Sequence, residues 1–69
     1  MEIDMLKKVA ERTPFRPFTI RLSNGATYSI REPRDFGAPR DAHTLVYFGE
    51  RDLVLIDPVH VVEIVDQAA

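Results

Sequence analysis

Few residues in this sequence could perform acid–base chemistry, and they are scattered. His60 and Asp57 are the one pair that a catalytic mechanism could use, and they flank Pro58. Hydrolysis needs a nucleophile and a base held together in a pocket. The sequence contains no cysteine and no G-x-S-x-G, Walker or H-E-x-x-H motif. We therefore expect a non-enzymatic protein with His60 as a structural residue, and hydrolysis at His60 and Asp57 is the catalytic alternative.

Metal and cofactor sites are also not indicated. His43 and His60 lie far apart and have no C-x-x-C or H-x-x-x-H companion. No apolar run approaches the roughly 20 residues that span a bilayer, and residues 1–4 are too acidic for a signal peptide. We expect a soluble protein with no metal, no cofactor and no membrane contact. We also expect it in the cytoplasm, because a chain without cysteine is compatible with a reducing compartment.

The net charge of −2 conceals two oppositely charged parts of the chain. Residues 7–40 carry eight basic and three acidic side chains, a net charge of +5, whereas residues 41–69 carry one basic and six acidic side chains, a net charge of −5. Such a chain could present a basic surface or pair its halves across a subunit contact. A solvated surface of mixed charge is the third interpretation.

Residues 32–42 (E-P-R-D-F-G-A-P-R-D-A) contain two prolines and a glycine, which predicts a long loop. Loops of about a dozen residues in so small a domain are often mobile or functional. Arg31, Arg34 and Arg40 concentrate here, and Phe36 is available to stack on a ring or to fill the core. This is the best candidate for a binding loop, with solvated disorder as the alternative.

The first secondary-structure element should be an amphipathic helix. Apolar residues recur at helical spacing between charged ones, at Ile3, Leu6, Val9 and Ala10. Thr13-Pro14 should end the helix, since a residue before proline avoids helical geometry. We expect a helix over 3–12 and a β-domain over 14–66, forming one domain over 1–69. A helix this short must dock on the rest of the protein, and Phe15 and Phe18 should fill the bottom of a barrel beneath it.

The next segment predicts a β-hairpin of defined register. Phe18, Ile20 and Leu22 alternate with polar residues, as do Tyr28 and Ile30. A two-residue Asn-Gly loop would mix apolar and polar residues on one face. A three-residue loop, Ser23-Asn24-Gly25, pairs Ile20 with Tyr28, Phe18 with Ile30 and Leu22 with Ala26, and so keeps the faces apart. Gly25 should then be left-handed.

Residues 44–48 and 53–56 are apolar on both faces, and 49–52 should form the turn between them. This pairs Tyr47 with Val54 and Leu45 with Ile56. The opposite face is also apolar; its members are Val46, Phe48, Leu53 and Leu55. Either the helix or another subunit must cover that face. Because disulfides and clustered metal ligands are absent, burial between copies is the remaining way to stabilise so small a core, so we expect a homo-oligomer.

Asp57-Pro58 should break the chain before a last strand over 60–65, as in a strand that turns the corner of a small barrel. From Pro14 onward the chain resembles a family of short uncharacterised bacterial proteins with a P-F-x-P-F-x-I-x-L-x-[ND]-G-x-x-[YF] opening and an I-D-P-x-H-I-x-x-I close. The matching segments here are Pro14–Tyr28 and Ile56–Ile64. The resemblance implies no established activity.

A weaker resemblance is to the Sm-like proteins, including the bacterial host-factor RNA chaperone. Their signature, apolar-x-L-x-[ND]-G, matches residues 20–25, and Asp35 followed by Phe36 can match the aspartate of their nucleotide pocket. The resemblance implies an N-terminal helix, a five-stranded bent barrel and ring assembly. The chain departs from the pattern at Ile30, where a glycine is expected, and at Asp57-Pro58, where basic residues are expected.

These observations predict a mainly β protein, a small five-stranded SH3/Sm-like barrel preceded by one N-terminal α-helix. The leading functional hypothesis is a self-associating, non-enzymatic binding or assembly module of unknown ligand. The alternative is an Sm-like RNA-binding oligomer. Its RNA site would consist of Asn24, Arg31, Arg34, Asp35, Phe36 and Arg40.

Overall fold

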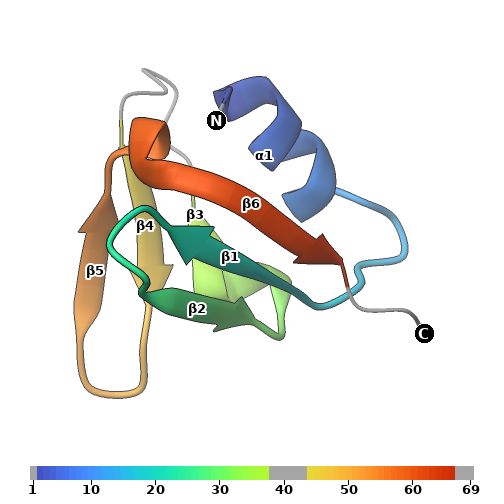
Figure 1. The fold of residues 1–69 in the computed structure, drawn as a ribbon. Helices are drawn as coiled ribbons and strands as arrows, with labels where there is room; N and C mark the ends of the chain where they lie inside the picture. Colours follow the sequence, from blue (N-terminus) through green and yellow to red (C-terminus); the bar gives the residue numbers. More distant parts are fainter. Residues whose placement is uncertain (1, 38–43, 67–69) are drawn as a thin grey trace.

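The computed structural model describes residues 2–37 and 44–66. Its elements are, in chain order, α1 (Ile3–Ala10), β1 (Phe18–Leu22), β2 (Thr27–Ile30), the 3-10 helix η1 (Pro33–Asp35), β3 (Phe36–Gly37), β4 (Leu45–Phe48), β5 (Leu53–Ile56), the 3-10 helix η2 (Pro58–His60) and β6 (Val61–Asp66). They form two antiparallel sheets, of order β2-β1-β6 and β3-β4-β5 (Figure 1). The predicted mainly β fold behind one N-terminal α-helix is confirmed.

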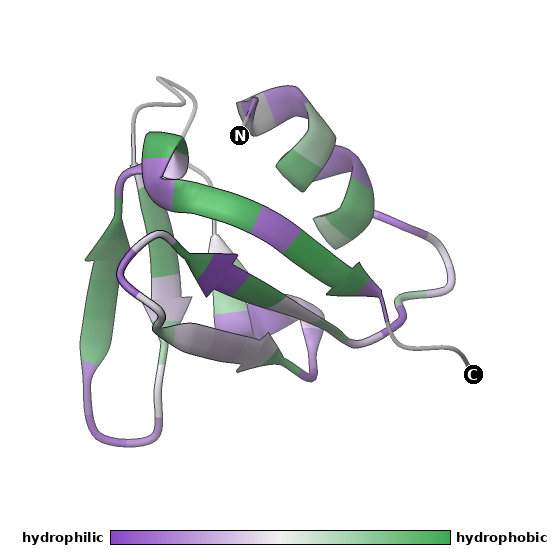
Figure 2. Ribbon diagram, viewed as in Figure 1, coloured by the Kyte–Doolittle hydropathy of each residue, from purple (hydrophilic) through white to green (hydrophobic). Residues whose placement is uncertain are grey.

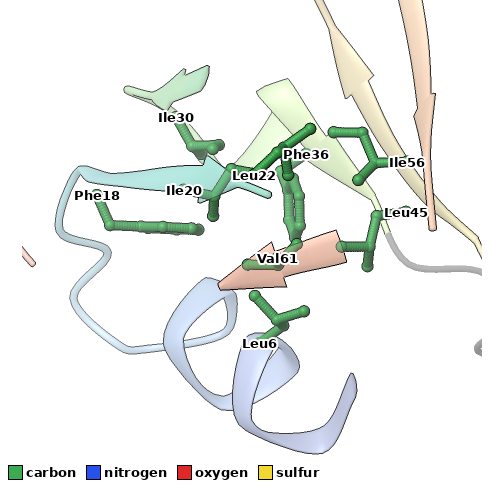
Figure 3. Packing of buried hydrophobic residues seen from close by; sticks show 9 residues of the cluster. All are labelled: Leu6, Phe18, Ile20, Leu22, Ile30, Phe36, Leu45, Ile56 and Val61. Carbon is green, nitrogen blue, oxygen red and sulfur yellow. The ribbon is translucent and has the colours of Figure 1, made fainter. Parts of the chain in front are cut away.

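The helix α1 ends at Ala10, two residues before the predicted end. Its last turn is closed by the N–H of Glu11, which donates to the carbonyl of Lys7 at 2.9 Å. Leu6 is completely buried and lies close to Val61 of β6 in the core (Figure 3). Tertiary packing of Leu6 therefore holds a helix that is too short to be stable alone.

The β1–β2 hairpin has the predicted register. Phe18 lies opposite Ile30, and Ile20 lies opposite Tyr28. Phe18, Ile20 and Ile30 are completely buried, because the register places all three on the inner face of the sheet. The outer face of the hairpin is polar.

The turn of this hairpin is the predicted three-residue loop. The N–H of Leu22 donates to the carbonyl of Ala26 at 2.8 Å, and the N–H of Gly25 donates to the carbonyl of Leu22 at 3.0 Å. Gly25 has a φ of +88°, in the left-handed region that favours glycine. Asn24 Oδ1 accepts the N–H of Ala26 at 2.9 Å. Asn24 and Gly25 are therefore explained by turn geometry.

The β4–β5 hairpin also has the predicted register, with Leu45 opposite Ile56 and Tyr47 opposite Val54. Leu45 and Ile56 are buried on its inner face. At the turn, the N–H of Gly49 donates to the carbonyl of Asp52 at 2.9 Å.

The last strand, β6, pairs with β1 and completes the first sheet. Ile64 lies opposite Ile20 and Val65 lies opposite Thr19, with a register shift between Arg21 and Leu22. The prediction that the strand begins at residue 60 is wrong by one residue, because η2 extends through His60. β1 is thereby the central strand of its sheet.

The prediction of a loop throughout 32–42 is wrong for its described part. Glu32 and Asp35 cap the 3-10 helix η1 reciprocally, with Pro33 at its start. Phe36–Gly37 then pairs with β4. Residues 38–42 lie outside the described residues.

Both sheets contribute to one hydrophobic core (Figure 3). Its buried members are Leu6, Phe18, Ile20, Leu22, Ile30, Phe36, Leu45, Ile56 and Val61. Residues 2–37 and 44–66 contain six strands and not the predicted five, because η1 separates β2 from β3. Within these residues no strand pairing joins the two sheets, so a closed barrel is not found.

Candidate functional site

The first candidate site is a hollow of about 480 Å³ beside η1, lined by three of the residues predicted to bind RNA: Arg31, Arg34 and Asp35. Arg34 Nε donates to Glu32 Oε2 at 2.7 Å. Asp35 Oδ2 accepts the backbone N–H groups of Arg31 at 3.3 Å and of Glu32 at 3.1 Å. Since Glu50 also lines the hollow, its two arginines face three carboxylates. This balance does not attract a phosphate backbone.

The other residues of the predicted RNA site lie elsewhere. Phe36 is 7% exposed and packs edge-to-face on Phe18, with 5.9 Å between the ring centroids. It therefore fills the core and is not available to stack on a base. Asn24 lines a different hollow, and Arg40 lies outside the described residues.

That second hollow, of about 340 Å³, lies between the β1–β2 turn, β5 and η2. Its apolar and aromatic lining residues are Leu22, Tyr28, Val54, Leu55 and Ile56. Its polar residues are Ser23, Asn24, Asp57 and His60, and no lysine or arginine among the described residues lines it. An apolar hollow with a few polar groups is the usual form of a small binding site, and the carboxylate gives this one a preference for a cationic or hydrogen-bond-donating group.

Hydrogen bonds at the rim of the second hollow join η2 to the β1–β2 turn. Ser23 Oγ lies 3.3 Å from His60 Nδ1, and the N–H of Ser23 donates to the carbonyl of His60 at 2.8 Å. Asp57 Oδ1 accepts the N–H of Val59 at 3.0 Å. The carboxylate thus caps η2, and no hydrogen bond links it to the imidazole within the described residues. The three side chains therefore do not form the carboxylate–imidazole–hydroxyl arrangement that activates a serine.

The outer face of the β4–β5 hairpin carries the four apolar residues Val46, Phe48, Leu53 and Leu55, which we call the outer apolar face. Val46 lies opposite Leu55, and Phe48 lies opposite Leu53. Phe48, Leu53 and Leu55 are 47%, 57% and 66% exposed. Figure 2 shows hydrophobic residues along β5, far from α1, which lies beside β6. The helix therefore does not cover this face.

The edge of β5 is free as well. β5 is the end strand of its sheet, and no other strand of residues 2–37 and 44–66 pairs with its second edge. Arg51 precedes β5 and Asp57 follows it. Neither side chain forms an ion pair within the described part of the chain. An unpaired strand edge beside apolar side chains is a place where another strand can bind.

Ion pairs connect the basic and acidic parts of the sequence within one chain. Asp66 Oδ2 lies 2.6 Å from Arg12 Nη1 and 3.6 Å from Arg16 Nη2, and Arg21 pairs with Glu63. The hydrogen bond from Arg12 is the main cause that lowers the pKa of Asp66; desolvation opposes it, and the positive charges of Arg12 and Arg16 lower the pKa further. Three basic residues of the first part are therefore paired with two acidic residues of β6.

A third hollow, of about 540 Å³, lies between the end of α1 and η1. Its basic residues are Lys7 and Arg12, and Glu11 also lines it. The guanidinium of Arg12 is already bound to Asp66 and to the carbonyl of Arg16, at 3.1 Å. The hollow therefore offers little free positive charge to an anion.

Reasoning from the sequence missed the roles of Ser23, Tyr28 and Arg51. Ser23 contacts a residue 37 positions away, and no local pattern indicates such a contact. Tyr28 packs against Tyr47 of the other sheet with 5.1 Å between ring centroids. Arg51 was assigned only to a turn, and its position before a free strand edge is visible only in the structure.

No family model, no curated protein and no solved structure matches this chain. Among the described residues, no helix has the length and apolar character that a membrane crossing requires. The same residues contain no group of three or more His, Cys, Asp or Glu side chains arranged to hold a metal ion.

Proposed function

We propose that this chain is a small, non-enzymatic assembly module that binds a second copy of itself through the β4–β5 hairpin. The outer apolar face is the observation that carries this proposal. Its Phe48, Leu53 and Leu55 are about half to two-thirds exposed in a single chain. Complete burial of one such side chain contributes about 1.5–3 kcal/mol relative to exposure. Contact with another subunit recovers part of that free energy.

The size of the chain supports the same proposal. A domain of 69 residues has a small core and contains no cysteine for a disulfide. Such domains gain stability from oligomerisation when other cross-links are absent. The lack of cysteine also agrees with a reducing compartment, and we place the protein in the cytoplasm.

The order of elements supports an SH3/Sm-like barrel as the finer description of the fold. β2 and β3 count as one interrupted strand if η1 is taken as a break within it, which gives five strands after α1. η2 turns the chain between β5 and β6, and β6 returns to β1. The motifs shared with the short bacterial proteins lie on the first hairpin and on the segment from β5 to β6, so we propose the same fold for that family.

Sedimentation velocity over a wide range of protein concentration tests the proposed function. The wild-type chain should change from monomer to dimer as concentration rises, and Leu53→Ser with Leu55→Ser should remain monomeric. The matched control replaces two exposed valines of the other sheet, Val62→Ser with Val65→Ser, and should associate as the wild type does. A wild-type chain that stays monomeric at every concentration would overturn the proposal.

RNA binding is the second candidate function. The observation in its favour is that Arg31, Arg34 and Asp35 line a hollow together with the aromatic residues Tyr47 and Phe48. The three carboxylates of that hollow make it the weaker proposal. Gel-shift titration with U-rich and A-rich RNA at low salt tests it: binding should fall steeply with salt and in Arg31→Ala with Arg34→Ala. If neither RNA is retarded, this candidate is lost.

A further inference from the structure

We infer that the second copy adds its own β5 to the free edge of β5, in antiparallel direction, with Val54 opposite Val54 and with Arg51 of each copy opposite Asp57 of the other. This inference rests on the proposed self-association and specifies its geometry. It makes the complex a closed, two-fold dimer and not an open chain or a ring.

The direction of pairing follows from symmetry and from the position of the apolar residues. A two-fold axis perpendicular to the sheet brings the same edge of two β5 strands together as an antiparallel pair. It also keeps the two outer apolar faces on the same side of the joined sheet. A parallel pair related by a two-fold axis along the strand would place the outer face of one copy beside the inner face of the other.

The alternation of side chains limits the register. Leu53 and Leu55 face outward, whereas Val54 and Ile56 face inward. Directly opposite residues of an antiparallel pair point to the same side of the sheet. An outward residue must therefore lie opposite an outward residue. This is possible only when the two-fold axis lies between the two copies of one β5 residue, so that this residue is opposite itself. Only Val54 and Leu55 are central enough to keep most of the strand paired.

Charge and proline chemistry separate these two registers. The register centred on Leu55 would place Asp57 opposite Leu53 and bring Pro58, which has no N–H, into the ladder opposite Asp52. The register centred on Val54 places Arg51 opposite Asp57, because each is three residues, or about 10 Å, from Val54. By symmetry this forms two ion pairs between charges that are unpaired within the described part of one chain.

The second copy also completes the hollow between η2 and the β1–β2 turn. Asp57 lies on the rim of this hollow, which has no lysine or arginine among its described lining residues. Arg51 of the second copy brings a guanidinium to that rim. On the outer face, Leu53 of one copy lies beside Leu55 of the other, so the two outer apolar faces become continuous.

Disulfide formation by single-cysteine variants can identify the register directly, because the chain contains no cysteine of its own. Opposite residues of an antiparallel pair lie within the Cα separation that a disulfide spans. Val54→Cys should therefore oxidise to a disulfide-linked dimer. Leu53→Cys and Leu55→Cys should not cross-link alone but should cross-link with each other when mixed. Faster cross-linking of Leu55→Cys alone would establish the other register and overturn the inference.

Charge substitutions give a second, independent test. Arg51→Glu should weaken dimerisation about tenfold, since it replaces two attractions by two repulsions at an exposed site. Adding Asp57→Asn should recover most of the loss, because it removes the repulsion and leaves an amide oxygen to cap η2. Lys8→Glu, on the exposed side of α1, is the matched control of equal charge change and should have no effect. Equal weakening by Arg51→Glu and Lys8→Glu would contradict the inferred ion pairs.

The outcomes separate this inference from the proposed function. If the wild type sediments only as a monomer, self-association itself fails and the inference fails with it. If the wild type dimerises but neither Val54→Cys nor the mixture of Leu53→Cys and Leu55→Cys cross-links, the proposed function stands and the inferred geometry is wrong.

Discussion

The two hairpins of this protein share one plan on their inner faces and differ on their outer faces. Each buries alternate residues in the common core, such as Ile20 in the first hairpin and Leu45 in the second. The outer face of the first is polar, and Thr19 Oγ1 lies 3.2 Å from Ser29 Oγ across its strands. The outer face of the second is apolar and exposed. In this molecule the inner faces of the hairpins determine the fold, and the outer faces determine what the folded chain can bind.

The largest loss of stability should come from substitutions on the inner faces, and it should be similar for the two hairpins. Ile20→Ala in the first hairpin and Leu45→Ala in the second should each lower the free energy of unfolding by about 2–5 kcal/mol, because each leaves a cavity in the core. A core of this size supplies only roughly 3–5 kcal/mol, so both variants should be largely unfolded. Urea denaturation followed by circular dichroism measures this.

The control for the inner faces is Thr27→Ala, on the exposed face of β2. It should cost less than about 1 kcal/mol, the range of strand propensity. If Leu45→Ala lowered the free energy of unfolding as little as Thr27→Ala, the second hairpin would not share the core with the first.

Substitutions in the turns of the two hairpins should change the stability of the chain by a smaller amount. Gly25→Ala should destabilise the chain by about 1–2 kcal/mol, because alanine is strained at φ of +88°. Nothing lies within contact of an added Cβ there, so the cost is that of the backbone alone. Gly25→Asn should recover part of it, since asparagine tolerates the left-handed region.

At Gly49 an added Cβ would overlap with the carboxylate of Asp52, in a backbone of ordinary φ. Gly49→Ala combined with Asp52→Ala should therefore be better tolerated than Gly49→Ala alone. A comparison of thermal unfolding midpoints tests both turns, and a Gly25→Ala variant as stable as the wild type would contradict the left-handed assignment.

The outer faces should contribute little to the stability of the monomer. At a protein concentration low enough to prevent association, Leu55→Ser should change the free energy of unfolding by no more than about 0.5 kcal/mol, as surface substitutions usually do. At high concentration the wild type should melt at a higher temperature than at low concentration, whereas Leu55→Ser should not. Differential scanning calorimetry at both concentrations provides the check. A large loss at low concentration would mean that the outer apolar face belongs to the fold of one chain.

The smallest effect should be that of the ion pairs of the first sheet on acid stability. The pKa of Asp66 is lower in the folded chain than in an unfolded one. Its ionised form therefore adds stability above the ordinary pKa of an aspartate, and this contribution is lost as pH falls through the lowered value. Asp66→Asn should flatten the acid side of the stability profile, and added salt should have a similar effect. The exposed Glu50→Gln serves as the control, and an unchanged profile in Asp66→Asn would remove the prediction.

The sequence predicted the hairpins well because their registers depend on local patterns. Alternation on both sides of Asn24-Gly25 and of the 49–52 turn is sufficient to assign opposite residues. η1 was missed, although Pro33 after Glu32 and before Asp35 is a recognisable capping pattern. The two prolines and the glycine of residues 32–42 instead favoured the prediction of a loop.

The candidate site was less predictable, because it depends on contacts between distant segments. The predicted RNA site assumed that Asn24 lies near Arg31, yet the two residues lie at opposite ends of β2. Phe36 could stack or be buried, and only the packing against Phe18 decides between these. The free edge of β5 depends on which strand ends each sheet, which alternation does not reveal.

The pairing of β1 with β6 has a consequence for how the chain is made. β1 is synthesised before its second neighbour, β6, which is complete only when residue 66 has been added, 44 residues after the end of β1. At synthesis rates of about 5–20 residues per second, one edge of β1 waits about 2–9 seconds for its partner. Translation rate therefore sets how long the nascent chain presents an open strand edge that chaperones or neighbouring nascent chains can bind.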